Sequence, residues 1–235
     1  MKLQKHVRYQ VKEFAPEETQ LSQRVFGLVP QSVYFDFSID MDIDTEKFKL
    51  IYVYGLSGEG KTIFKDELKK ELSDLRYVVI DYDDNHLDSL KDKKLSEIFD
   101  LEKDREFVIR LFSTFGMLEM RNVFSKFCEL SAGQQKRVQY MHLLYQAYIK
   151  TGLEQSDCVI LVDEFLTFVD SLSSKVFAQG LRKFMNKMLP KTLLFAFGCN
   201  DHICYTFEDL CIHLVNGKVY SITEVTDVER ELNAD

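Results

Sequence analysis

The feature that most constrains this sequence is a glycine-rich turn between an apolar segment and an amphipathic one. Residues 49–54, Lys-Leu-Ile-Tyr-Val-Tyr, are aliphatic and aromatic enough for a buried β-strand. The turn Gly55-Leu-Ser-Gly-Glu-Gly-Lys-Thr62 follows directly, and residues 63–72 have the apolar spacing of a helix. This is the G-x-x-x-x-G-K-T pattern in the strand–loop–helix setting that it requires. The sequence therefore predicts a phosphate-binding loop.

Each part of this turn has a physical role in holding phosphate. The glycines let the backbone wrap around an anion, and the N–H groups at the start of the helix point toward it. Lys61 supplies positive charge for the β- and γ-phosphates of a nucleotide, and the Thr62 hydroxyl is a ligand for Mg²⁺. The expected nucleotide contacts in this segment are Gly55, Ser57, Gly58, Glu59, Gly60, Lys61, Thr62 and Ile63.

A second apolar segment ends in two carboxylates. Residues 157–164, Asp-Cys-Val-Ile-Leu-Val-Asp-Glu, predict another buried strand. Asp163 is the candidate for holding Mg²⁺ together with Thr62, and Glu164 is the candidate general base that polarises an attacking water. Two carboxylates after an apolar strand also fit a solvated strand end, but the glycine-rich turn favours the catalytic interpretation. Together the two segments predict a P-loop nucleoside triphosphatase and leave its subclass open.

Composition narrows the remaining possibilities. The 235 residues, 46% of them hydrophobic, suit one large α/β domain with a small appendage at most. The net charge of −8 gives no general attraction for nucleic acid, which would need a local basic patch. The start of the chain lacks an apolar signal core and no run of 18 apolar residues occurs, so we expect no direct membrane insertion and a cytoplasmic location. The five cysteines form no CxxC pair and are expected to be reduced and buried.

A third motif lies between these two segments. Residues 129–137 read Glu-Leu-Ser-Ala-Gly-Gln-Gln-Lys-Arg, which resembles the LSGGQ signature of ABC-type ATPases. A serine at a helix start and small residues after it leave an open, positively polarised helix end for a phosphate. Asp163-Glu-Phe-Leu-Thr-Phe-Val-Asp170 likewise resembles the DEPTSALD block of the same family. Four motifs in the family's order, over roughly residues 30–220, identify the chain as similar to ABC-type nucleotide-binding domains.

The resemblance implies a fold, a ligand and an assembly. The fold would be an α/β P-loop sandwich, with a mixed sheet flanked by helices and a reduced helical subdomain. The ligands would be ATP and Mg²⁺, bound between the two halves of a head-to-tail homodimer. In such a dimer the signature completes the partner's site, and Asp170 meets the opposite subunit. The implied trans contacts are Ser131, Ala132, Gly133, Gln134 and Asp170, and Tyr34 is the expected aromatic contact for adenine.

Two positions depart from the family pattern. No glutamine occurs between Thr62 and Gln134, so the usual Q-loop residue has no match. Its replacement could be one of four acidic residues, or these residues could simply be solvated: Asp81, Asp83, Asp84 and Asp100. The switch histidine expected after residues 192–197 falls near Cys199 or Asn200, with His202 slightly late. We expect Asn200 at this position, where it could hydrogen-bond a γ-phosphate but could not carry a proton.

The departures also bear on domain organisation. We expect an N-terminal arm or small edge addition over residues 1–30 and an ABC-type domain over 31–235, with the helical subdomain at about 84–150. Residues 106–118 are its expected helix. The segment Arg24-Val-Phe-Gly-Leu28 and the sequence Asp163-Glu-Phe165 further resemble a group of soluble ABC-type ATPases that are often fused to a predicted acetyltransferase domain.

These features leave three functional hypotheses. The first is a soluble ATPase that drives conformational change in an unknown protein or nucleic-acid partner. The second is the ATP-binding subunit of a membrane transporter, which the missing Q-loop glutamine and the compressed helical region disfavour. The third is a module that holds ATP with slow or no hydrolysis, which Glu164 disfavours and the missing switch histidine favours.

Overall fold

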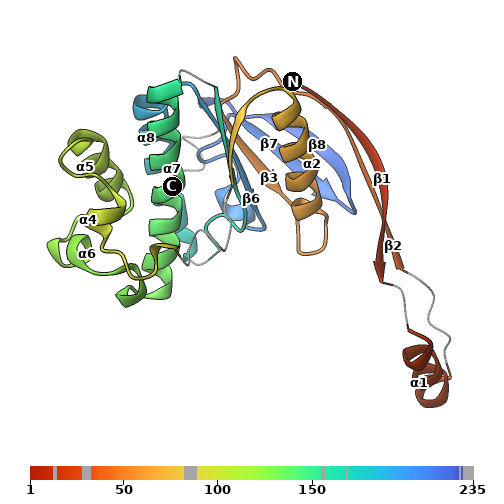
Figure 1. Cartoon of the computed structure of the whole chain (residues 1–235). Helices are drawn as coiled ribbons and strands as arrows, with labels where there is room; N and C mark the ends of the chain where they lie inside the picture. The colour runs from red at the N-terminus through yellow and green to blue at the C-terminus, as the bar shows by residue number, and fades with distance from the viewer. Residues whose placement is uncertain are drawn as a thin grey trace.

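A computed structural model of the chain describes residues 1–12, 15–27, 33–81, 89–154, 157–167, 169–227 and 229 (Figure 1). Within these residues, eight strands form one sheet. Their order across it is β1 (Lys2–Lys12), β2 (Val33–Asp42), β8 (Lys218–Glu224), β7 (Leu210–Val215), β3 (Leu50–Tyr54), β6 (Thr192–Gly198), β5 (Cys158–Val162) and β4 (Val78–Asp81). From β7 to β4 all neighbours are parallel, whereas β1 with β2 and β7 with β8 are antiparallel. The predicted mixed sheet is confirmed.

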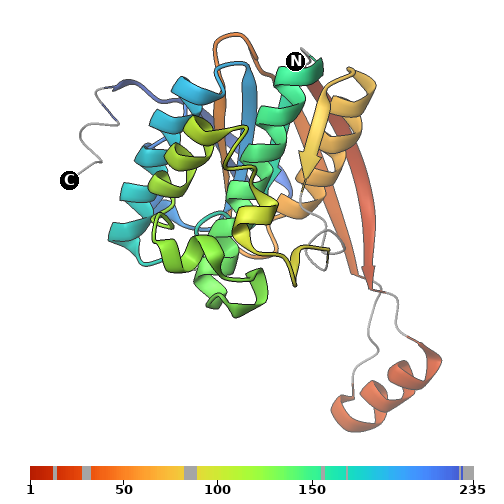
Figure 2. The same cartoon turned by 60° about the vertical axis from the view of Figure 1, so that its left-hand side comes forward.

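Helices cover both faces of this sheet, and one further helix lies away from it (Figure 1 and Figure 2). They are α1 (Pro16–Phe26), α2 (Lys61–Asp74), α4 (Leu95–Ile98), α5 (Arg105–Thr114), α6 (Met120–Phe124), α7 (Ala132–Glu154) and α8 (Ser171–Met188), with short 3₁₀ turns η1 (Phe127–Glu129) and η2 (Asp201–Ile203). In Figure 1, α7 and α8 cover one face and α2 covers the other. The small helices α4, α5 and α6 lie outside α7, where they occupy the segment expected to form the reduced helical subdomain.

The central strand β3 joins the two hydrophobic cores of the domain. Leu50 and Tyr52 are buried in the core under α7 and α8, and Ile51 and Val53 are buried in the core under α2. Adjacent residues of a strand point to opposite faces, so an apolar run is buried on both sides only in the interior of a covered sheet. The apolar segment before the glycine-rich turn is therefore the middle of the domain.

The N-terminal residues are part of the sheet. Strand β1 pairs with β2 along its length, so the expected boundary between residues 30 and 31 separates two paired strands. Helix α1, between these strands, has no buried residue and lies away from the sheet in both views (Figure 1 and Figure 2). The large side chains that it exposes are Leu21, Val25 and Phe26. The segment from Arg24 to Leu28, which resembles a group of soluble ABC-type ATPases, begins on this helix. Arg24 lies on α1, and Leu28 lies outside the described residues.

Asp209 joins three elements of the fold, namely β3, α8 and β7. Its carboxylate accepts the backbone N–H groups of Lys49 and Leu50, at 2.9 and 3.0 Å, and an Arg182 N–H at 2.7 Å. These groups belong to the start of β3 and to α8, while Asp209 itself immediately precedes β7. The side chains of Asp209 and Arg182 are only 19% and 20% exposed, so water replaces these bonds poorly.

We expect Asp209→Ala to lower the free energy of unfolding by about 3 kcal/mol, because it leaves a half-buried guanidinium and two backbone donors without this acceptor. Urea denaturation measures the change. The matched control is Glu224→Ala, which removes an exposed partner of Lys47 and should cost less than about 0.5 kcal/mol. Equal costs for the two variants would contradict the anchoring role of Asp209.

Candidate functional site

The glycine-rich turn forms the predicted cradle between β3 and α2. Gly58 and Gly60 have φ values of 85° and 91°, a region that favours glycine. Gly60 also lies against the Phe35 ring, which would be 3.0 Å from an added Cβ. The turn is held by Glu59 N–H, which donates to Leu56 O at 3.2 Å, and Gly55 N–H, which donates to Gly198 O at 3.2 Å. The start of α2 therefore presents its N–H groups toward a concave loop.

A cavity of about 440 Å³ lies in front of this loop. Four segments of the chain that are remote in sequence supply its lining. The lining residues are Phe35, Ser57, Gly58, Gly60, Lys61, Thr62, Ile63, Asp163, Glu164, Thr167, Gly198 and Cys199. The cavity thus brings the loop residues together with both predicted carboxylates, because β3, β6 and β5 are parallel and end at the same edge of the sheet.

Lys61 lies across the loop that it follows. Its ammonium donates to the backbone oxygens of Gly55 and Leu56, at 2.6 and 2.8 Å. These two carbonyls hold the Lys61 ammonium over the cradle, close to the N–H groups at the start of α2. An anion in the cradle would exchange two neutral acceptors for charged ones, which bind an ammonium more strongly.

The two carboxylates leave β5 through an unusual turn. Glu164 and Leu166 have positive φ values of 51° and 56°, which are uncommon for residues with a side chain. The turn is fixed from α7 and from β6: Tyr140 OH donates to Glu164 O at 3.1 Å, and Phe165 N–H donates to Phe197 O at 2.8 Å. Burial raises the pKa of the Tyr140 hydroxyl, so it stays protonated and remains a donor. Backbone strain of this kind is stored where it positions a side chain, here the exposed carboxylate of Glu164.

The site has the ligand chemistry for a hard divalent cation. Thr62 and Asp163 both line the cavity, and hydroxyl and carboxylate oxygens are the donors that Mg²⁺ takes in proteins. Within the described residues, no group of three or more His, Cys, Asp or Glu side chains could hold a metal ion by itself. The donor set therefore fits an ion that takes its other ligands from phosphate and water.

An ion pair that the sequence analysis missed lies beside this donor set. Lys65 Nζ is 3.5 Å from Asp163 Oδ2 and 3.6 Å from Asp81 Oδ1. Asp81, one of the proposed Q-loop replacements, ends β4 and is 11% exposed. Asp100 instead accepts the N–H groups of Glu102 and Lys103 in a turn, and Asp83 and Asp84 lie outside the described residues.

Strand β2 places Phe35, and not Tyr34, in the cavity. Tyr34 is 49% exposed and stacks against the Arg8 guanidinium, 4.5 Å from its ring centroid. Phe35 shares the inward face of β2 with the buried residues Phe37 and Ile39. The alternation of residues 33–41 contained this signal, because Phe35 belongs to its apolar set and Tyr34 to its polar one.

The segment after β6 places Cys199, and not Asn200, in the cavity lining. The Asn200 side chain donates to Leu166 O at 3.0 Å, and its backbone oxygen accepts the Tyr52 hydroxyl at 3.1 Å. Asn200 therefore supports the turn that carries Glu164. His202 is half-buried in η2 and is also not among the lining residues.

The signature segment caps α7 away from this cavity. Ser131 N–H donates to Gln134 Oε1 at 3.0 Å, and Gln134 N–H points back to Ser131 Oγ at 3.4 Å, which is a capping box. Ser131 and Ala132 are exposed, and a Cβ added at Gly133 would meet nothing within 4 Å. None of these residues lines the cavity of their own chain.

Asp170 caps α8 in a similar way. Its side chain accepts the Ser173 N–H at 3.0 Å, and this bond lowers the pKa of Asp170. Asp170 is exposed, which the expected contact with another subunit requires.

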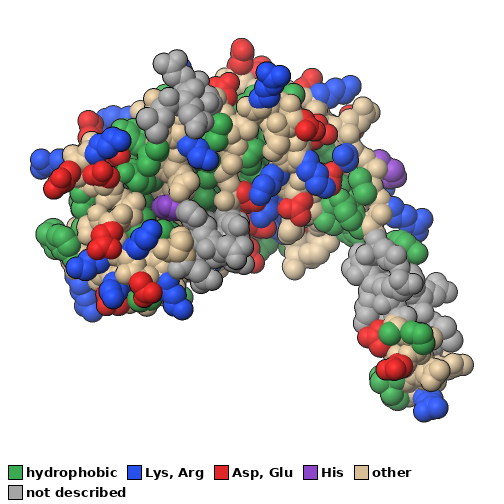
Figure 3. All heavy atoms as spheres, in the orientation of Figure 1, with side chains coloured by type: hydrophobic (Ala, Val, Ile, Leu, Met, Phe, Trp, Pro, Cys, Tyr) green, Lys and Arg blue, Asp and Glu red, His purple; other side chains and the backbone are tan. Residues whose placement is uncertain are grey.

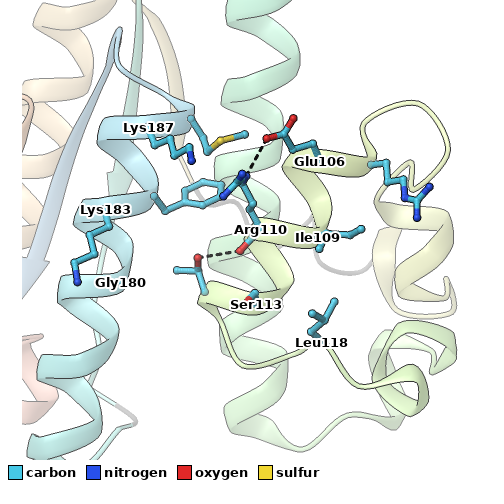
Figure 4. Close-up of a pocket in the computed structure, with 12 residues that line it drawn as sticks. Glu106, Ile109, Arg110, Ser113, Leu118, Gly180, Lys183 and Lys187 are labelled. Carbon is cyan, nitrogen blue, oxygen red and sulfur yellow. Dashed lines mark hydrogen bonds and ion pairs between the residues drawn. The ribbon is translucent and has the colours of Figure 1, made fainter.

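A larger cavity, of about 750 Å³, lies between α5 and α8 and is separate from the predicted site (Figure 4). Its lining combines apolar side chains, such as Ile109 and Phe184, with Lys183, Lys187 and Arg110. The Arg110 side chain is bound to Glu106 at 3.1 Å (Figure 4). No sequence-predicted site residue lines this groove.

Comparison with solved structures shows that the chain has the fold of ATP-binding cassettes. The ATP-binding cassette MJ0796, in a dimeric post-hydrolysis state bound to ADP and Pi, matches with a TM-score of 0.62 at 17% identity, over 96% of this chain and 99% of that one. The structure of cbiO1 from Clostridium perfringens, part of the ABC transporter complex cbiONQ, has a TM-score of 0.56 at 16% identity, over 83% and 84% of the chains. The ADP conformation of MJ1267, a cassette of an ABC transporter, has a TM-score of 0.52 at 14% identity, over 85% and 86%. No model of a protein family and no curated protein matches the sequence.

We expect Phe35→Ala to weaken the binding of an adenine nucleotide about tenfold, because an aromatic contact of this kind contributes roughly 1–1.5 kcal/mol. Titration calorimetry with ADP measures the affinity. Tyr34→Ala is the matched control on the same strand and should bind like the wild type. The opposite result, loss of affinity only with Tyr34→Ala, would show that adenine lies against the other face of β2.

Proposed function

We propose that this chain, which has the fold of ATP-binding cassettes, is an ATPase that binds ATP with Mg²⁺ and hydrolyses it at the interface of a head-to-tail homodimer. One observation carries the proposal: Lys61, Thr62, Asp163 and Glu164 line a single cavity at the carboxyl edge of the sheet. The four side chains supply a cation, two metal ligands and a base, which are the parts that phosphoryl transfer to water requires.

Binding uses groups that are already in place. The N–H groups at the start of α2 face the loop, and the Lys61 ammonium needs only to leave the Gly55 and Leu56 carbonyls to meet the β- and γ-phosphates. Phe35 offers a ring beside Gly60 for the base. Thr62 and Asp163 would hold Mg²⁺, which neutralises charge on the phosphates when bound.

We assign the role of general base in hydrolysis to Glu164. Its backbone oxygen is fixed by Tyr140 and Thr167, both at 3.1 Å, while its carboxylate stays exposed at the cavity. A carboxylate held in this way can accept a hydrogen bond from a water and take its proton during attack on the γ-phosphate.

The dimer follows from the position of the signature. Ser131 and Gly133 present an open helix end that does not face the cavity of the same chain, so a second copy is the simplest source of the missing phosphate contacts. MJ0796, which has the same fold, is described as a dimer.

The partner that the ATPase acts on is proposed to be a protein or nucleic acid in the cytoplasm. Within the described residues, no helix is both long and apolar enough to cross a membrane. The face seen in Figure 3 carries Lys or Arg and Asp or Glu side chains interspersed, without one large basic area, which favours a protein partner.

Two alternatives have support of their own. The similarity to cbiO1, part of a transporter complex, favours the ATP-binding subunit of a transporter, and co-purification with a membrane protein would identify this case. Cys199 in the cavity, at a position where the family resemblance implies a switch histidine, favours a module that hydrolyses ATP slowly or not at all.

We expect Glu164→Gln to retain ATP binding while turnover falls by about 10² to 10⁴, because the amide keeps the shape of the side chain but cannot take a proton. Calorimetry and a phosphate-release assay measure the two quantities. Lys61→Ala should instead lose binding, and Lys70→Ala, on the exposed side of α2, should change neither. Wild-type turnover in Glu164→Gln would remove Glu164 as the base.

We expect the Glu164→Gln protein to dimerise in MgATP and to return to monomer when nucleotide is removed. Adding Gly133→Asp should keep it monomeric, because the new carboxylate would face the partner's phosphates while the space above Gly133 is open within the chain. Sedimentation velocity measures the mass. A strict monomer at saturating MgATP would refute the homodimer.

A further inference from the structure

Lys65 occupies the space between the ends of two parallel strands. It lies on α2, one helical turn after Lys61, and its side chain is only 13% exposed. Its ammonium is 3.5 Å from Asp163 at the end of β5 and 3.6 Å from Asp81 at the end of β4. One cation is therefore shared by the candidate metal ligand and a second, nearly buried carboxylate.

The two carboxylates are not equivalent. Within the described residues, Lys65 makes the only ion pair of Asp163, whose other oxygen accepts the Glu164 N–H at 2.9 Å. Asp81 also binds Lys69, at 3.0 Å, and Lys69 makes no ion pair with Asp163. Lys65 is thus the group that balances the charge of Asp163, and Asp81 is a second acceptor for the same ammonium.

The Lys65 ammonium and a bound metal ion would compete for the same carboxylate, that of Asp163. A divalent cation bound by Thr62 and Asp163 would repel an ammonium that contacts the same carboxylate. Without a metal, removal of the ammonium would leave two poorly exposed carboxylates close together, which is unfavourable. Lys65 and the metal are therefore alternative counter-charges for Asp163.

We propose that Lys65 is the internal counter-cation of Asp163 in the metal-free site, and that Asp81 receives its ammonium when Mg²⁺ and nucleotide bind. The proposal rests on the proposed function and adds a positioning residue to it. Lys65 lowers the affinity of the empty site for metal, and Asp81 lowers the cost of moving Lys65 aside. Metal binding thereby changes the charge balance at the end of β4.

The test is the Mg²⁺ concentration that gives half-maximal binding of a fluorescent ATP analogue. Lys65→Met should lower this concentration about fivefold, because the competing cation is gone, and Asp81→Asn should raise it about fivefold, because Lys65 then remains on Asp163. Lys65→Arg should behave like the wild type. Lys69→Met is the matched control, since within the described residues Lys69 pairs with Asp81 and not with Asp163, and should shift the midpoint less than twofold.

A second readout needs no nucleotide. Addition of MgCl₂ alone should raise the Tm of Lys65→Met and leave that of the wild type unchanged. A purely structural role would lower stability in both variants but would not move the Mg²⁺ midpoint in opposite directions. Binding with unchanged midpoints in Lys65→Met and Asp81→Asn overturns this inference alone, whereas no nucleotide binding by the wild type overturns the proposed function as well.

Discussion

The parallel pairing of β3, β6 and β5 is the constraint on which the candidate site depends. Parallel strands end at the same edge of a sheet, so the loop after Tyr54, the turn after Val162 and the segment after Gly198 meet there. Each strand is buried on both faces, which fixes its position to within the tolerance of a packed core. The cavity residues are therefore held by the core rather than by their own loops.

Helix α7 connects the signature segment to the turn that carries Glu164. It begins at the signature residue Ala132, and eight residues later its Tyr140 hydroxyl holds the backbone of Glu164. A helix is stiff over two turns, so displacement of the signature end would act on the turn that carries Glu164, the proposed base. Tyr140 also accepts the Leu166 N–H, at 3.4 Å, and Asn200 binds the Leu166 carbonyl. The strained turn is thus held by α7 and by the segment that follows β6.

Charge at the site is compensated locally although the chain carries a net charge of −8. Lys61 lies on backbone carbonyls, Lys65 lies between Asp81 and Asp163, and Glu164 is left at the cavity. The ammonium groups on α2 therefore have different tasks despite their regular spacing. Lys61 is available to an anion, Lys65 balances two carboxylates, and Lys70, itself exposed, binds the nearly buried Glu67.

The sequence by itself determined the features that are local. The glycines at 58 and 60, the apolar strands and the Ser131–Gln134 cap follow from interactions over a few residues, and their spacing made the fold class predictable. Tertiary structure decided which side chains meet. It placed Phe35 instead of Tyr34 in the cavity, set Cys199 there with Asn200 under the turn, and brought Lys65 to Asp81 and Asp163. Strand alternation could have indicated Phe35, but Lys65 is 16 positions from Asp81 and 98 positions from Asp163 in the sequence. No local propensity encodes such a contact, because it depends on the register in which β4 and β5 pair and on how α2 packs across them.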